Sequence, residues 1–227
     1  MCSIIAANGQ KGLDLVFLEN RDRPKERFIG NDIRRIGDVI GIYDFRARGM
    51  ACGYSLKSGT AGGVANILGY VGKKSRGVLL LEALRDGRSA EGAARLIERK
   101  ALSGDYSSAT YILCDKRSII SVESFGTRID ESKNGRKKFV VTTNHFHRLS
   151  KGGKPQNSVL REKYLERLGK DITQESVLKL ATRHRNPAIC RHGRTLASFA
   201  VFKKPSENPR IFYSIEEPCK GYNEFIV

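Results

Sequence analysis

Short apolar runs separated by polar turns fill the first third of the chain and predict β-strands. The runs CSIIAAN (2–8) and LDLVFLEN (13–20) flank NGQKG, whose Asn and Gly residues are typical of a hairpin turn. Further apolar runs predict strands at 33–43, 51–57 and 61–68. The first third of the chain is therefore expected to be built from strands rather than helices.

The pattern then changes, because apolar residues recur every three or four positions, which predicts helices. A break at DGRSAEG divides this stretch, and Ser89 has the chemistry of a residue that caps the helix after it. The same spacing returns later in the chain and is expected to end at Gly169 in the third helix. The four predicted helices are at 76–86, 90–102, 157–169 and 173–184.

The remaining apolar runs predict strands that surround the second helix pair. They lie at 109–115, 118–124, 139–146, 195–204 and 210–217. Strands in consecutive series and helices in pairs favour antiparallel sheets with helices on their outer faces over an alternating parallel sheet. No linker or repeat marks a boundary, so residues 1–227 are predicted to form a single α+β domain. KNGRKK and SKGGKPQ are expected to be exposed loops.

Composition narrows the class of protein. Apolar residues are 40% and charged residues 29%, which is typical of a globular protein. No apolar stretch approaches the roughly 18 residues that a membrane span needs, and no secretory signal is recognisable, so a cytoplasmic location is expected. The five cysteines are odd in number, widely spaced and without a CxxC pair. This argues against a disulfide framework and a structural zinc site.

A formal net charge of +17 is typical of proteins with an anionic partner. The basic residues are nevertheless spread along the chain, and the densest stretches, 134–139 and 183–194, are short. Trp is absent and no RNA-binding aromatic signature occurs. These features favour a solvated basic surface over nucleic-acid binding, and they leave an anionic small-molecule substrate open.

Cys2 directly follows Met1 at the head of an apolar run. One interpretation is a small buried hydrophobe of the first strand. In the other, removal of Met1 gives one residue both a thiol and a free α-amine, whose pKa is about 8. Such an amine can act as the general base for the thiol beside it. Cys2 is therefore a candidate nucleophile.

Polar residues lie at the ends of predicted strands and offer partners for such a nucleophile. Arg21 and Asp22 follow the second strand, Asn66 lies in the apolar run AGGVANIL, and Asn144 follows FVVTT. Side-chain amides on apolar strands are costly to bury unless they are hydrogen-bonded, so each needs a structural partner or a function. Taken singly, each is best explained structurally; together with Cys2 they favour a catalytic site.

The sequence gives less support to phosphate-binding, serine-hydrolase and metal sites. No phosphate-binding GxxxxGK[ST] loop and no GxSxG motif occur, and GTAGGVANILG lacks the GxGxxG spacing. His145 and His147 alternate along a predicted strand, and Cys190 and His192 have the same spacing. Neither pair has a third ligand at motif distance, so neither a metal site nor a cofactor is predicted.

Several motifs, in this order, resemble those of the N-terminal-nucleophile (Ntn) hydrolases. They are Cys2 after Met1, NRD at 20–22, GVANILGYVG at 63–72, TTNHF at 142–146, NSVLR at 157–161 and ICRH at 189–192. The chain is most similar to the linear-amide group, which includes isopenicillin N acyltransferase-like peptidases and the choloylglycine hydrolase and penicillin V acylase relatives. The NRD triplet also resembles NRDE-type proteins. The resemblance implies a four-layer αββα sandwich of two antiparallel sheets.

The resemblance also implies roles for single residues. Cys2 would be the nucleophile and, through its α-amine, the base. Asp22 is similar to the family carboxylate that positions this amine. Asn66 and Asn144 match family positions that bind the oxyanion or orient the amine, and Arg161 matches an arginine placed next to the cysteine, where a cation lowers a thiol pKa.

One position departs from the pattern of these relatives. They often have Arg-Asn-x-Asp after the second strand, whereas this chain has Glu19-Asn20-Arg21-Asp22. The Asn-x-Asp spacing is kept, but the arginine falls between the two, so the role of Arg21 stays open.

The function expected from these observations is an N-terminal cysteine amidohydrolase or acyltransferase. It would cleave a linear C–N amide bond of a small-molecule substrate through a Cys2 thioester, after removal of Met1. Two alternatives stay open: a catalytically silent protein of the same fold that binds a ligand, and a basic nucleic-acid-binding protein in which Cys2 is a core residue. No membrane partner is expected, and whether the chain forms homo-oligomers is left open.

Overall fold

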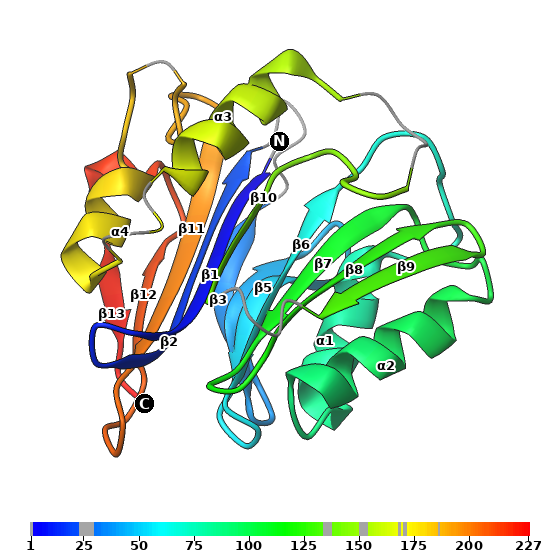
Figure 1. Cartoon of the computed structure of the whole chain (residues 1–227), viewed down its shortest axis with the longest axis horizontal. Helices are drawn as coiled ribbons and strands as arrows, with labels where there is room; N and C mark the ends of the chain where they lie inside the picture. Colours follow the sequence, from blue (N-terminus) through cyan, green and yellow to red (C-terminus); the bar gives the residue numbers. More distant parts are fainter. Residues whose placement is uncertain are drawn as a thin grey trace.

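The computed structural model describes residues 2–22, 30–133, 138–149, 154–167, 169, 172–185 and 187–227. Two antiparallel sheets face each other, and a pair of helices covers the outer face of each sheet (Figure 1). The layers therefore follow in the order helix, sheet, sheet, helix. This is the predicted four-layer α+β architecture.

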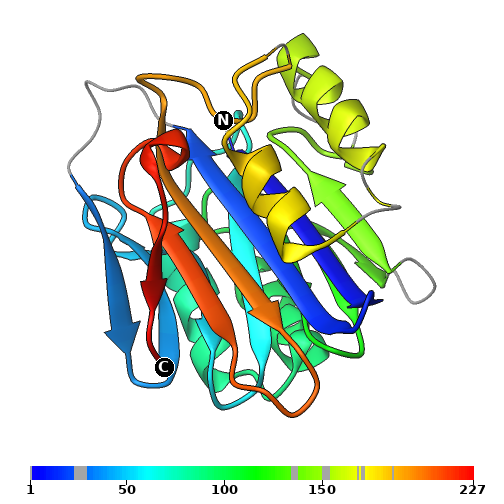
Figure 2. The same ribbon diagram turned by 90° about the vertical axis from the view of Figure 1, so that its left-hand side faces the viewer.

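Sheet A contains the first strand of the chain. Its strands, in spatial order, are β10 (Phe139–Thr142), β1 (Cys2–Gln10), β2 (Leu13–Asp22), β11 (Thr195–Lys203), β12 (Arg210–Ser214) and β13 (Asn223–Phe225). The helices α3 (Gln156–Glu166) and α4 (Gln174–Ala181) lie over its outer face, as Figure 2 shows. Side chains alternate along β1, so Ile5 packs under the helices while Cys2 and Ile4 face sheet B.

Sheet B forms the other half of the sandwich. Its strands, in spatial order, are β3 (Asn31–Ile36), β4 (Val39–Asp44), β5 (Gly49–Ser55), β6 (Thr60–Asn66), β7 (Ala109–Cys114), β8 (Ile119–Phe125) and β9 (Arg128–Lys133). The helices α1 (Arg76–Asp86) and α2 (Ala90–Ala101) cover its outer face. A third apolar layer fills the space between the two sheets, and Cys2 belongs to it.

The four helices are confirmed, and the first two begin at the predicted positions. Ser89 caps α2, because its Oγ accepts a hydrogen bond from the Gly92 backbone N–H at 3.1 Å. The third helix ends at Glu166 rather than at Gly169. None of the described helices has the length and apolar character of a membrane span.

The prediction of one strand over 33–43 is wrong. Gly37 has a φ of +60°, a left-handed conformation that glycine adopts at low cost, and the chain reverses there to form the β3–β4 hairpin. The strand predicted over 139–146 stops at Thr142, so His145 and His147 do not alternate along a strand. The short edge strands β9 and β13 were not predicted from the pattern. Most of the expected loops KNGRKK and SKGGKPQ lies outside the described residues.

Candidate active site

Cys2 begins β1, which runs inside sheet A between β10 and β2. The residue is 2% exposed and lies directly opposite Arg21 of β2. Its side chain is part of the layer between the two sheets. The start of β1 lies near α3, at the end of the sandwich where Figure 1 marks the N-terminus.

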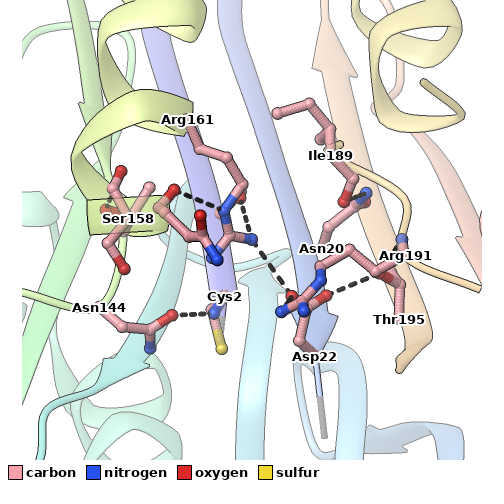
Figure 3. Close-up of polar contacts among 12 residues, drawn as sticks. Cys2, Asn20, Asp22, Asn144, Ser158, Arg161, Ile189, Arg191 and Thr195 are labelled. Atoms are coloured by element: carbon pink, nitrogen blue, oxygen red, sulfur yellow. Dashed lines mark hydrogen bonds and ion pairs between the residues drawn. The ribbon is translucent and has the colours of Figure 1, made fainter. Parts of the chain in front are cut away.

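Asn144 contacts the backbone of Cys2. The Cys2 N–H donates a hydrogen bond to Asn144 Oδ1 (Figure 3), and Asn144 Nδ2 donates to the Asn66 carbonyl oxygen at 2.8 Å. The segment that follows β10 thus links the nitrogen of the first strand to the end of β6 in the opposite sheet. The acceptor on this nitrogen is a neutral amide, which raises the pKa of a free amine less than a carboxylate would.

Asp22 lies at the centre of a second polar network. Its Oδ2 forms an ion pair with Arg161 Nη1 at 3.1 Å and lies 3.8 Å from Arg191 Nη1, while its Oδ1 accepts a hydrogen bond from Thr195 Oγ1 at 2.6 Å (Figure 3). Arg161 Nη1 also donates to Ser3 Oγ at 3.3 Å. The Asp22 and Arg161 side chains are almost fully buried, so the network joins β1, β2, β11 and α3 beside Cys2.

The Asp22 network lies on the helix-covered face of sheet A. Asn20, two residues before Asp22 on the same face, donates to the Ala181 carbonyl of α4 at 2.8 Å and to the Ile189 carbonyl at 3.2 Å. Its Oδ1 accepts from Ser198 Oγ at 2.6 Å. All these contacts join β2 to its neighbours, so Asn20 has a structural role.

The Arg161 guanidinium is buried beside the Asp22 carboxylate. Burial lowers the pKa of the guanidinium, and the Asp22 carboxylate opposes this effect. Nη2 of Arg161 is buried and has no hydrogen-bond partner among the described residues. A spare cationic donor is therefore held next to the first strand.

Arg21 and Glu19 face the layer between the sheets, as Cys2 does. Arg21 forms a buried ion pair with Asp44 of β4, which ties the two sheets together. The Glu19 side chain lies against Gly63, and a Cβ built there would be 2.1 Å from Glu19 Oε2. The Val64 amide is near this carboxyl group, but neither oxygen has a partner with good hydrogen-bond geometry in the described part of the chain.

The surroundings of the Glu19 carboxyl favour its protonated form. Burial raises its pKa well above the usual range, the Cys2 side chain raises it further, and Arg21 opposes both effects. A buried carboxyl group with a raised pKa therefore lies in the layer of the candidate nucleophile. Arg21 supplies a positive charge on that face, two residue pairs nearer the start of β1.

A cavity of about 450 Å³ opens beside this end of the sandwich, and both Arg21 and Asn66 line it. The other cationic side chains on its wall are Arg46, Lys73, Lys74 and Arg76. Lys74 pairs with Asp105 at 3.0 Å, but Arg46, Lys73 and Arg76 form no ion pair with any described residue. Burial lowers the pKa of the Arg76 guanidinium, which also responds to the charge of Cys2. The cavity is therefore basic and close to the candidate nucleophile Cys2.

The structure places the six predicted site residues at one end of the sandwich, in two groups. Cys2, Asn144 and Asn66 form one chain of hydrogen bonds, whereas Asp22 and Arg161 pair on the other face of sheet A. Arg21, the sixth, lies opposite Cys2 and is paired to Asp44. The sequence hypothesis did not include Asp44, Arg76, Arg191 or Thr195. Only Arg191 carried a signal, as part of the ICRH motif.

No protein-family model matches the chain, and neither does any curated protein sequence. Among solved structures, the chain is similar to penicillin V acylase from Agrobacterium tumefaciens, an Ntn hydrolase. The TM-score is 0.51 at 11% sequence identity, and the match covers 93% of this chain and 85% of that chain. At this identity the likeness concerns the fold alone. It confirms the predicted architecture, and the chain has the four-layer fold of an Ntn hydrolase.

Proposed function

We propose that the protein is an N-terminal cysteine amidohydrolase or acyltransferase acting on a linear amide bond. The observation that carries the proposal is the hydrogen bond from the Cys2 nitrogen to Asn144 Oδ1. Once Met1 is removed, this nitrogen is a free α-amine with a pKa of about 8. An amine that donates to Asn144 keeps its lone pair available for the thiol proton.

In the proposed reaction the α-amine takes the proton of the Cys2 thiol, and the sulfur attacks the carbonyl carbon of the substrate amide. The C–N bond then breaks, and the α-ammonium returns the proton to the departing amine. The acyl group stays on the Cys2 sulfur as a thioester. We assign the stabilisation of the oxyanion to the side-chain amide of Asn66, which lines the adjacent cavity.

The thioester is resolved by a second nucleophile. Water attacks the thioester carbonyl and gives a proton to the α-amine, the C–S bond breaks, and the sulfur regains the proton as the carboxylic acid leaves. When an amine attacks in place of water, the same steps transfer the acyl group. Hydrolysis and acyl transfer therefore use the same side chains.

The basic cavity favours a substrate that carries a negative charge. Arg46, Lys73 and Arg76 line it without carboxylate partners among the described residues, and cations are best satisfied there by a carboxylate or phosphate of the substrate. An N-acyl amino acid has such a carboxylate next to its amide bond. In this proposal the charge of the substrate is recognised by the turn between β4 and β5, by the segment before α1 and by the start of α1, apart from the nucleophile on β1.

A catalytically silent protein that binds a ligand in the same cavity is the second candidate. The observation that favours it is Glu19, which stands where the family that the sequence resembles often has arginine. A buried carboxyl group near Cys2 cannot stabilise a thiolate as a cation does. Arg21 supplies a cation on the same face, but the Asp44 carboxylate neutralises part of its charge.

The test is turnover of an amide panel by the untagged protein. The panel contains penicillin V, suggested by the name of the similar acylase, and N-acyl amino acids, with the released amine as the readout. We expect turnover that is lost in Cys2→Ala and retained in the control Cys219→Ala, both with unchanged circular dichroism. Amine release by the Cys2→Ala variant would contradict the proposal. Saturable ligand binding without turnover would support the silent alternative.

Charge recognition is tested separately with a matched pair of substrates. Lys73→Ala is expected to raise KM for an N-acyl amino acid, while KM for the corresponding uncharged carboxamide stays the same. The difference arises because only the first substrate has an anion to place in the basic cavity. An equal change in KM for both substrates would show that the basic cavity does not recognise the charge of the substrate.

A further inference from the structure

A cluster of two histidines and one carboxylate lies at the junction of two elements that carry site residues. His145 and His147 come from the segment after β10, and Glu162 comes from α3. His145 Nε2 lies 2.7 Å from Glu162 Oε2, and His147 Nε2 lies 3.1 Å from Glu162 Oε1. The three potential ligand atoms all lie within 4.8 Å of one another. The spacing in sequence offered no third ligand for the two histidines; the fold provides it.

The hydrogen bonds around His145 determine where its ring proton lies. Thr143 Oγ1 donates its only proton to the Ser158 carbonyl oxygen at 3.1 Å, so it must accept a hydrogen bond from His145 Nδ1–H at 3.1 Å. In the neutral ring Nε2 then carries a lone pair that faces a carboxylate oxygen of Glu162. Two ligand atoms directed at each other in this way can bind one shared cation.

The orientation of His145 matches that of a metal ligand. Histidines that bind metals commonly donate their other ring N–H to a nearby oxygen, which fixes the tautomer and the ring direction. Thr143 is that oxygen here. The histidine pair and one carboxylate also form the N₂O donor set of zinc sites that keep a further coordination position open.

The segment that carries the histidines is anchored before any metal binds. The Glu123 carboxylate accepts hydrogen bonds from the backbone N–H groups of His147, Arg148 and Leu149 at 2.6, 3.0 and 2.9 Å. Glu123 is itself buried on β8. The backbone around His147 is thereby held in place, and preorganised ligands lower the cost of ordering a metal site.

Space for a further ligand lies next to the cluster. A cavity of about 400 Å³ is lined by His147 and Glu162 together with Thr142 and Arg148. The His147 side chain is 37% exposed, whereas His145 is buried. A metal ion held by the three side chains would therefore be reachable by water or by a small anion from this cavity.

We infer that His145, His147 and Glu162 form a binding site for a divalent transition metal, Zn²⁺ in the first place. The donor set excludes the oxygen-rich coordination that Ca²⁺ and Mg²⁺ prefer. The inference does not depend on the proposed function. Its consequence for that function is structural, since Asn144 precedes His145 and Arg161 precedes Glu162 in the sequence. A bound metal would hold the two segments that contact β1 against each other.

A second group of potential ligands, His184, His192 and Cys219, defines the necessary control. These side chains are exposed or half-buried, and the two histidine rings stack with their centroids 4.1 Å apart. His192 pairs with Glu217 at 3.5 Å rather than with a member of the group. Removing His184 and His192 by alanine substitution eliminates this group without touching the first cluster.

The experiment uses the untagged full chain, stripped with a chelator and titrated with Zn²⁺ by calorimetry and with Co²⁺ by visible absorption. We expect one high-affinity ion per chain and the intense absorption bands of four-coordinate Co²⁺. His147→Ala and Glu162→Gln should each weaken binding at least 100-fold, and Thr143→Val should weaken it 10- to 100-fold through loss of ligand orientation. Glu166→Gln, one turn further along α3, removes the same charge and should leave affinity unchanged.

Two results would overturn the inference. One is no binding by the wild-type chain. The other is binding that survives His147→Ala but disappears in the His184→Ala/His192→Ala variant. Because His147 is partly exposed, its alanine variant is expected to fold even if Glu162→Gln does not, and circular dichroism reports this. Retained binding by folded His147→Ala protein would equally count against the site.

Discussion

The buried Glu19 carboxyl makes the stability of the protein depend on pH in a predictable direction. Its side chain is inaccessible to water, and its oxygens have no partner of good geometry among the described residues. Burial raises its pKa well above the usual range, so the folded state holds the proton more tightly than the unfolded chain. The substitution Glu19→Gln keeps the size of the side chain and removes the titration.

The sign follows from proton linkage. The unfolded chain releases this proton as the pH rises through about 4.3, while the folded chain retains it. Over that interval the folded state binds one more proton, so the free energy of unfolding falls by about 1.4 kcal/mol for each pH unit from this group. Below the unfolded pKa both states are protonated and Glu19 adds no slope. In Glu19→Gln this contribution is absent at every pH.

Urea unfolding between pH 4 and 8, in half-unit steps, measures the effect. The free energy of unfolding of Glu19→Gln minus that of the wild type should rise as the pH exceeds about 4.3, with a slope of at most about 1.4 kcal/mol per unit, and should level off once the folded carboxyl also loses its proton. The exposed control Glu207→Gln should show a flat difference within about 0.5 kcal/mol. The reasoning is refuted if the difference for Glu19→Gln is also flat, because the carboxyl would then titrate alike in both states.

Three further predictions concern the same end of the sandwich. Asp22→Asn leaves the Arg161 guanidinium buried without its carboxylate and should lower the free energy of unfolding by about 3–5 kcal/mol in urea titrations. A loss below about 1 kcal/mol would show that the fold does not need the ion pair between Asp22 and Arg161. Gly63→Ala places a Cβ 2.8 Å from a phenylalanine ring and 2.1 Å from a carboxylate oxygen, so it should destabilise by about 1–3 kcal/mol. Gly92→Ala, in a helix where the added Cβ meets only ordinary van der Waals contacts, should stabilise by about 0.5–1 kcal/mol; equal signs in thermal melts would contradict this. Asn144→Ala removes the acceptor on the Cys2 nitrogen and should slow acylation about 100-fold in a time course followed by mass spectrometry, with an unchanged rate as the opposing result.

Local patterns predicted most of the fold because the long strands are apolar runs and three of the four helices begin with a side-chain cap. The failures have local causes as well. Gly37 and Asp38 reverse the chain within 33–43, and the prediction of one strand overlooked that Gly-Asp is a pair typical of hairpin turns. The strand β9, RIDESK, is polar at the edge of sheet B, so it has no buried face to reveal it.

The site was less accessible to sequence reasoning than the fold. Cys2 and Asn144 were proposed from their positions at the ends of apolar runs and Arg161 from the family resemblance, while spacing along the chain indicated nothing about their contacts. Thr195 binds Asp22 across 173 residues of sequence, and a strand beginning with threonine carries no mark of such a role. In the sequence Glu162 is one of several charged residues of a predicted helix, and nothing links it to the histidines that the fold places beside it.

The identity of the nucleophile is the central claim, and the burial of the other thiols makes it testable in one experiment. Burial raises the pKa of Cys190 to about 12 and also raises the pKa values of Cys52 and Cys114, so these thiols should react slowly at neutral pH. The half-buried Cys219 is the internal reference.

The measurement is the intact mass of the untagged protein before and after a vinyl-sulfone probe, followed by peptide mapping. The account predicts a mass that lacks Met1 and an adduct that forms at Cys2 well before it forms at Cys219. A retained Met1, or labelling of Cys2 no faster than labelling of Cys219, would contradict an activated N-terminal nucleophile.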